Sequence, residues 1–147
     1  MGYGAVSTAI TILTAIVPAA PPTLTTTING NNVHVEWQSP STNAQNDYGA
    51  PITAYNVQIQ AIDGISYFTD LTACNGTSSV VVTNLYCDIP ISTLLGAPFN
   101  LVYGSSVYAR SAAINIIGSS LFSTAGNGAV IAMSYAPDAP VNLTTNF

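Results

Sequence analysis

The sequence predicts an all-β fold, an antiparallel β-sandwich of about seven short strands. Three observations predict it: apolar and polar residues alternate with a period of two, turn-forming residues separate the alternating segments, and helical periodicity is almost absent. Hydrophobic residues make up 48% of the 147 residues, and there are 11 glycines and 9 prolines. This balance favours a packed core with many tight turns over a disordered chain.

The first half of the chain carries the clearest strand patterns. Alternation predicts strands at Val33 to Trp37 and at Tyr55 to Gln60, each with one apolar face. Asp63 and Gly64 separate the second strand from Ile65 to Thr69, and this pair of residues predicts a β-hairpin.

The second half is expected to add three strands and one helical turn. The strands are predicted at Ser79 to Leu85, Val107 to Asn115 and Ala129 to Tyr135. The helical turn is predicted at Ile91 to Leu95, directly after Pro90.

The longest apolar run extends from Ala5 to Ala20 and is expected to be a strand rich in β-branched residues. It has no basic flank, is too short to span a bilayer, and is interrupted by Thr8, Thr11 and Thr14. A remnant of a secretion signal is the less favoured alternative, and no membrane span is expected in this segment.

The two ends of the chain carry the same pattern. Ser-Thr-Ala at 7–9 precedes an apolar run and a Pro-x-x-Pro element at 18–21, and Ser-Thr-Ala at 123–125 precedes a run and Pro-x-x-Pro at 137–140. Leu24 and Leu143 follow the two elements at an offset of 119 residues. The two Ser-Thr-Ala elements are offset by 116 residues, so the pattern repeats after about 118 residues and predicts a tandem array.

This repetition divides the chain into three parts. Residues 1–19 are expected to be the last strand of a preceding repeat, or a strand donated to another subunit. Residues 20–136 are expected to form one complete domain, and residues 137–147 the first strand of a following repeat. The predicted partners are therefore copies of the chain itself in series.

Four segments carry motifs in a fixed order. They are Pro21-Pro22-Thr23-Leu24, Trp37 followed by Ser39-Pro40, Gly49 to Val57, and Val107 to Ser120 with the pattern Ala-x-Asn-x-x-Gly-x-Ser. In this order the segments resemble a fibronectin type III domain. The resemblance implies an immunoglobulin-like sandwich with Trp37, Tyr55 and Val57 in its core.

Two features depart from that family. Val107 stands where the family has its corner tyrosine, so the hydrogen-bonded corner is expected to be absent. The connection from Cys74 to Tyr103 is longer than usual and is similar to repeats in large surface proteins of ciliates.

Charged residues make up only 5% of the sequence, and Arg110 is the sole cation in a chain of net charge −5. Without clustered Lys and Arg, binding to nucleic acid or to an anionic membrane surface is disfavoured. A surface this poor in charge favours association. Glycans are the other partners expected at such a surface.

Cys74 and Cys87 are expected to form a disulfide, with two free buried thiols as the alternative. A disulfide predicts an extracellular or cell-surface location. Asn75-Gly76-Thr77 and Asn142-Leu143-Thr144 fit the N-glycosylation pattern, and Asn75 lies in an expected turn.

No catalytic residue, metal site or cofactor is predicted, and the chain is not expected to be an enzyme. His34 and Glu36 share one face of a strand, but an exposed polar pair is favoured over a catalytic dyad because an open sheet face offers no pocket. The aspartates are scattered and form no Asp-x-Asp run: Asp47, Asp63, Asp70, Asp88 and Asp138.

Two functions are consistent with these observations. The favoured one is a non-catalytic structural repeat unit of an extracellular or cell-surface fibre. The alternative is an adhesive module that binds carbohydrate or protein through the Cys74 to Tyr103 connection and the Asn43 to Tyr48 loop.

Overall fold

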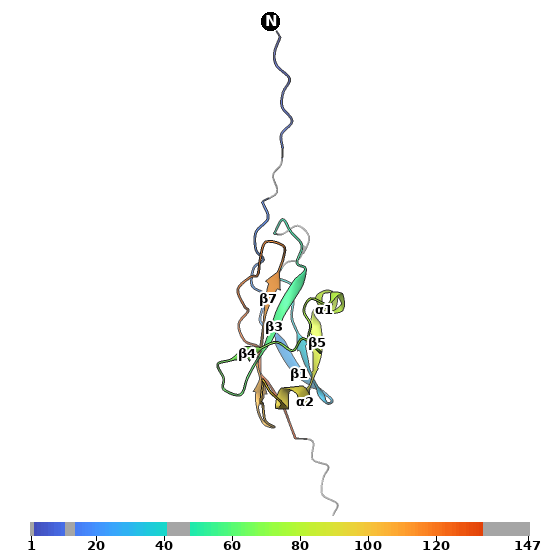
Figure 1. Ribbon diagram of the computed structural model, residues 1–147, viewed down its shortest axis with the longest axis vertical. Coiled ribbons are helices and arrows are strands. Elements are labelled where there is room, and N and C mark those ends of the chain that lie inside the picture. The colour runs from blue at the N-terminus through green and yellow to red at the C-terminus, as the bar shows by residue number, and fades with distance from the viewer. Residues whose placement is uncertain (1, 11–13, 41–47, 134–147) are drawn as a thin grey trace, which may run out of the picture.

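The computed structural model describes residues 2–10, 14–40 and 48–133, which form a two-layer β-sandwich with two short helices (Figure 1). One antiparallel sheet has the order β1-β2-β5, from β1 (Thr25–Asn29), β2 (Asn32–Glu36) and β5 (Tyr86–Pro90). The other has the order β4-β3-β7, from β4 (Tyr67–Phe68), β3 (Ala54–Gln60) and β7 (Ala109–Ile114). A ribbon pairs β6 (Ser106–Val107) with β8 (Ala129–Val130), and the helices are α1 (Ser79–Asn84) and α2 (Ile91–Leu95). The predicted all-β sandwich is confirmed.

The core forms where the alternating strands turn their apolar faces inward. Val33 and Val35 of β2 are fully buried, and Val57 of β3 is 1% exposed. Trp37 and Tyr55 are also buried, with ring centroids 5.6 Å apart. Burial raises the pKa of Tyr55 above its ordinary value of 10.0, and a hydrogen bond with Ser39 opposes this rise.

The hairpin expected at Asp63 and Gly64 joins β3 to β4. Gly64 has a positive φ of 70°, which glycine adopts without steric cost. The Asp63 carboxylate accepts hydrogen bonds from the backbone N–H groups of Ile65, at 2.9 Å, and of Ser66, at 2.8 Å. Asp63 therefore stabilises the turn that sets the register of β4 against β3.

The strand expected at Ser79 to Leu85 is wrong, because this segment forms α1. Its three consecutive valines give no alternation, and no side chain of the helix is buried. A strand would need a neighbour to satisfy its backbone groups, whereas the helical turn satisfies them locally, as in Val82 N–H to Ser78 O at 3.0 Å. Leu85 then ends the helix in the left-handed conformation, with φ of 61°.

The long connection from Cys74 to Tyr103 also contains a strand that the sequence did not reveal. Residues 86–90 form β5, which pairs with β2 in the register Val35 to Cys87 and Val33 to Ile89. Helix α2 follows at the predicted position, and its Leu94 is buried. The connection therefore supplies part of the sandwich itself.

The strand expected at Val107 to Asn115 is divided between two sheets. Val107 belongs to β6 and pairs with Ala129 of β8, whereas Ala109 to Ile114 form β7 beside β3. Val107 is fully buried at this change of partner. The last strand, expected from Ala129, comprises Ala129 and Val130 within the described residues.

The strand expected in the apolar run from Ala5 to Ala20 is not formed in residues 5–10 and 14–20, the part of the run that the structure describes. The described residues 2–10 are exposed and extend away from the sandwich, beyond the end where β7 finishes (Figure 1). In the described part of the chain no strand lies beside this run to pair with its backbone groups. The run lacks the partner that a β-strand requires.

Candidate functional site

The chain enters the sandwich at a joint made by residues 14–18 and the loops beside them. The backbone N–H of Ile16 donates to the carbonyl of Tyr48 at 3.0 Å, and the side-chain amide of Asn115 donates to the carbonyl of Ile16 at 2.7 Å. Pro18 is buried. Both backbone groups of Ile16 are therefore held by the domain that follows it.

Asn115 organises this joint from the loop after β7. It is 4% exposed, and its side-chain oxygen accepts the N–H groups of Ile117, at 2.9 Å, and Gly118, at 3.2 Å. Its amide nitrogen is thereby turned toward Ile16. The motif Ala-x-Asn-x-x-Gly-x-Ser had marked Asn115, but its contact with the entering chain depends on a tertiary approach that the motif does not encode.

On one side of the sandwich, side-chain hydrogen bonds cover the edge of β7 that does not pair with β3. Residues 119–126 run beside β7, and the hydroxyls of Ser120 and Ser123 accept the backbone N–H groups of Ala113, at 3.0 Å, and Ser111, at 3.1 Å. Ser120 and Ser123 in turn donate their own N–H groups to the carbonyls of the same two residues. The edge of β7 is thus satisfied without a regular partner strand.

On the same side, Asn127 joins this segment to β1. Its side-chain oxygen accepts the N–H of Thr26 at 2.7 Å, and its side-chain nitrogen donates to the carbonyl of Thr26 at 3.0 Å. The buried Thr26 hydroxyl donates to the carbonyl of Val107 at 3.1 Å and accepts the N–H of Ala129 at 2.9 Å. These bonds connect β1 with the β6-β8 ribbon.

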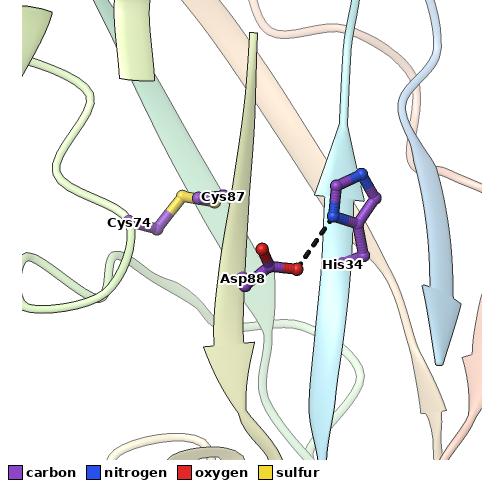
Figure 2. A network of polar contacts seen from close by, with 4 residues as sticks. All are labelled: His34, Cys74, Cys87 and Asp88. Atoms are coloured by element: carbon purple, nitrogen blue, oxygen red, sulfur yellow. Dashed lines mark hydrogen bonds and ion pairs between the residues drawn. A yellow bond between two sulfur atoms is a disulfide. The ribbon is translucent and has the colours of Figure 1, made fainter. Parts of the chain in front are cut away.

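The opposite side of the sandwich is closed by the disulfide between Cys74 and Cys87 (Figure 2). Cys87 belongs to β5, and its partner Cys74 lies in the segment that passes β3. In that segment the carbonyl of Gly76 accepts the N–H of Tyr55 at 2.9 Å. The disulfide therefore links the β1-β2-β5 sheet to a segment that is hydrogen-bonded to the other sheet.

No protein-family model matches this chain, and no curated protein matches it. The chain is similar in structure to a multi-domain fragment of titin, with a TM-score of 0.57 and 19% identity over 81% of this chain and 34% of that one. It is also similar to the sixth fibronectin type III domain of human fibronectin type III domain containing protein 3, with a TM-score of 0.55 and 20% identity over 85% and 95% of the two chains. The kinase region of twitchin from C. elegans gives a TM-score of 0.55 and 20% identity over 80% of this chain and 17% of that one.

The fold is that of a fibronectin type III domain. At this level of identity the likeness shows the fold alone, and the chain spans only a part of the titin and twitchin structures. The described part of the chain contains no helix with the length and apolar character needed to cross a bilayer. Similarity to surface proteins of ciliates stays a prediction.

The glycosylation candidate Asn75 lies beside the disulfide and is partly exposed. Its side-chain oxygen accepts hydrogen bonds from the N–H of Thr77, at 3.1 Å, and from the Thr77 hydroxyl, at 2.7 Å. The side chains of the acceptor pattern therefore face each other in one turn. The second candidate, Asn142, lies outside the described residues.

The polar face of β2 carries His34, whose ring nitrogen Nδ1 lies 2.8 Å from the Asp88 carboxylate on β5 (Figure 2). The ring also packs against Tyr86, with centroids 4.8 Å apart. In the register of β2 with β5, His34 lies opposite Asp88 and Glu36 lies opposite Tyr86. The two residues of the candidate dyad are therefore paired with residues of β5 and not with each other. His34 is thus in a cross-strand polar pair with Asp88 on an open sheet face.

The other aspartates within the described residues shape turns. Asp70 accepts N–H groups from Thr72 and Ala73, much as Asp63 does in its hairpin. No group of three or more potential metal ligands occurs among residues 2–10, 14–40 and 48–133. Asp47 and Asp138 lie outside these ranges.

Arg110 lies on the outer face of the β4-β3-β7 sheet. Its guanidinium is 3.7 Å from the ring centroid of Tyr67 and 4.3 Å from that of Phe122. It also donates two hydrogen bonds to the Gln58 side chain, at 2.9 and 3.1 Å. The only cation of the chain is thus held between two aromatic rings and connects β4, β3 and β7 with the segment after β7.

Proposed function

We propose that this chain is the structural repeat unit of an extracellular or cell-surface fibre, in which fibronectin type III domains follow one another in series. Residues 1–19 belong to the last strand of the preceding repeat, residues 20–136 form the domain, and residues 137–147 begin the next one. The function is mechanical: the unit supplies length and a protected, nearly neutral surface, and performs no catalysis.

The observation that carries this proposal is the joint at Ile16. The described residues of the apolar run before Ile16 have no strand partner in the described part of the chain, yet Ile16 itself is held by two hydrogen bonds, to Tyr48 and Asn115. The equivalent Ser-Thr-Ala at 123–125 lies against β7 in this domain, where Ser123 N–H donates to Ser111 O at 2.8 Å. By this equivalence, Ser7 to Ala9 pair with β7 of another copy.

An extracellular location and a glycan at Asn75 belong to the same proposal. The Cys74–Cys87 disulfide would persist in an oxidising compartment. Asn75 is partly exposed beside that disulfide, and a glycan there would project from the side of the sandwich. Such a glycan would solubilise a surface on which only 5% of the residues are charged.

Electron microscopy and intact mass of the native material test this function. We expect long filaments, and a chain far heavier than 15.1 kDa under denaturing conditions, whose mass falls on treatment with a glycosidase. Filaments that dissociate into chains near 15 kDa would instead show that the strand at residues 5–17 is donated between separate subunits. Compact monomers without filaments would overturn the proposal.

A further inference from the structure

An open groove lies at the end of the sandwich opposite the joint. Its volume is about 470 Å³, and its lining includes Ile28, Asn31, Ile91, Ser92, Tyr103 and Ala132. These residues come from the end of β1 and the turn after it, from α2, from the loop before β6 and from the last described residues of the chain. Figure 1 shows α2 and this turn at the far end from residues 14–18.

The joint end carries an exposed apolar tip. Ile116 is 84% exposed and Ile117 is 51% exposed in the loop after β7. Asn115 accepts the N–H groups of Ile117 and Gly118, so the loop is fixed by its own hydrogen bonds. Two adjacent isoleucines are therefore presented to solvent on a rigid turn.

The length of the connecting chain determines how closely successive domains approach. Ile131 is the last described residue with both backbone groups held by the domain: its N–H donates to Ser105 O at 3.0 Å, and its carbonyl accepts the Gly104 N–H at 2.7 Å. Ile16 is the first described residue that hydrogen-bonds to the domain, so its equivalent is taken as the first residue held by the next repeat. At the offset of 119 residues that equivalent is Tyr135, which lies outside the described residues.

Only residues 132–134, near the end of the 20–136 unit, would therefore lie between the last residue held by one domain and the first residue held by the next. The four Cα–Cα steps from 131 to 135 reach at most about 14 Å when fully extended. A span this short brings the groove end of one domain within side-chain contact of the joint end of its successor. The low charge of the sequence, 5% of residues, adds little repulsion between them.

We propose that the tip Ile116–Ile117 of each copy inserts into the groove of the preceding copy and forms a head-to-tail interface. This inference rests on the proposed function, because the series arrangement sets the spacing. The two surfaces are different patches of one chain, so the contact is heterologous and extends into an open filament. Burial of the isoleucines makes the joint stiff where the connecting residues alone would let it bend.

Cross-linking of two single-cysteine variants of the full chain tests the interface. Ile117→Cys in the tip and Ser92→Cys in the groove each carry one free thiol, since the native cysteines are paired. The two variants, one of them isotopically labelled, are mixed and mildly oxidised, and the dimers are weighed. We expect heterodimers in about five-fold excess over either homodimer, because only a heterologous contact brings the two positions together.

Val80→Cys is the matched control, because Val80 is 63% exposed on α1, away from both ends of the sandwich. Ile117→Cys mixed with Val80→Cys should give heterodimer only in the proportion that random pairing of the two chains produces. An Ile116→Asp substitution added to the Ile117→Cys chain should remove the excess seen with Ser92→Cys. Equal yields from the groove pair and the control pair would overturn the interface. Filaments of the unsubstituted protein together with equal yields would overturn this contact and leave the proposed array intact.

Discussion

The two sides of the sandwich, where the sheets end, are closed by different chemistry. On the β5 side, the covalent bond from Cys87 to Cys74 links one sheet to a segment that is hydrogen-bonded to β3. On the β7 side, serine hydroxyls and the Asn127 amide take the place of a regular strand. The hydrogen bonds on the β7 side occupy backbone groups of β7 that would otherwise be open to pairing with another chain, whereas the disulfide on the β5 side acts through side chains.

A glycine allows the close approach on each side. At Gly76 a Cβ atom would overlap the carbonyl oxygen of Tyr55, and at Gly126 it would lie 2.6 Å from the carbonyl oxygen of Leu24. Both contacts are with backbone, which cannot move aside as a flexible side chain could. The two sides therefore differ in the bonds that hold the covering segment. On both sides that segment packs directly against the backbone of its neighbour.

The largest expected loss of stability is at Gly76, and it should exceed the loss at Gly126. Gly76→Ala should destabilise the domain by more than about 3 kcal/mol, because the overlap with the Tyr55 carbonyl forces the segment off β3. Gly126→Ala should cost about 1–3 kcal/mol, because its contact is less severe. Urea denaturation of both variants measures the difference, with Gly2→Ala as control since nothing lies within 4 Å of that position. Equal losses at 76 and 126 would contradict this ranking.

The second effect concerns the covalent side. Replacing both Cys74 and Cys87 by Ala should cost about 3 kcal/mol of stability. The disulfide closes a loop between residues 13 positions apart, and without it the unfolded chain gains conformational entropy. Denaturation of the double variant, and of the wild type with and without reductant, measures this loss. Reduced wild type and the double variant should agree closely, and an unchanged midpoint on reduction would contradict the prediction.

The third effect concerns the hydrogen-bonded side. Ser123→Ala should cost about 1–3 kcal/mol, because the buried N–H of Ser111 loses its acceptor. Ser119→Ala is the matched control on the same segment, since Ser119 is exposed, and it should change stability by less than about 0.5 kcal/mol. Hydrogen exchange at the Ser111 amide should accelerate in the first variant only. Equal protection of that amide in both variants would show that water replaces the hydroxyl at no cost.

The smallest expected effect is at the turn before β4, which is an edge strand of the β4-β3-β7 sheet. Hydrogen bonds with Ser66 and Ile65 lower the pKa of the Asp63 carboxyl below its ordinary value of 3.8. The stability that it contributes is therefore complete above the ordinary pKa and is lost as the pH falls through the lower, folded-state pKa. Asp63→Asn should reduce the loss of stability between about pH 5 and 2, measured by denaturation over that range. A pH profile identical to that of the wild type would contradict it.

The sequence predicts what depends on local alternation. The segments Val33 to Trp37 and Tyr55 to Gln60 alternate, with every second residue apolar. The Asp63-Gly64 turn is stabilised locally by hydrogen bonds to the Asp63 carboxylate. These elements were predicted with small differences at their ends. Their patterns are set by neighbours that are close in sequence.

The errors arise where long-range partners decide the structure. Ser79 to Leu85 has the β-branched residues of a strand but no neighbouring strand, so local helical hydrogen bonds prevail. Tyr86 to Pro90 forms β5 because β2 lies beside it. The serine hydroxyls of the β7 side likewise require the register of residues 119–126 against β7, which no local pattern encodes.

The position of Arg110 has a consequence for proteolysis. It is the only Lys or Arg in the chain, so trypsin has a single peptide bond to cut, the one that joins Arg110 to Ser111. That bond lies in the middle of β7, with Arg110 opposite Gln58 on one edge and Ser111 bonded to Ser123 on the other. Cleavage must wait until the strand leaves the sheet. The rate of this single trypsin cleavage therefore reports the unfolding of the domain without any label on the protein.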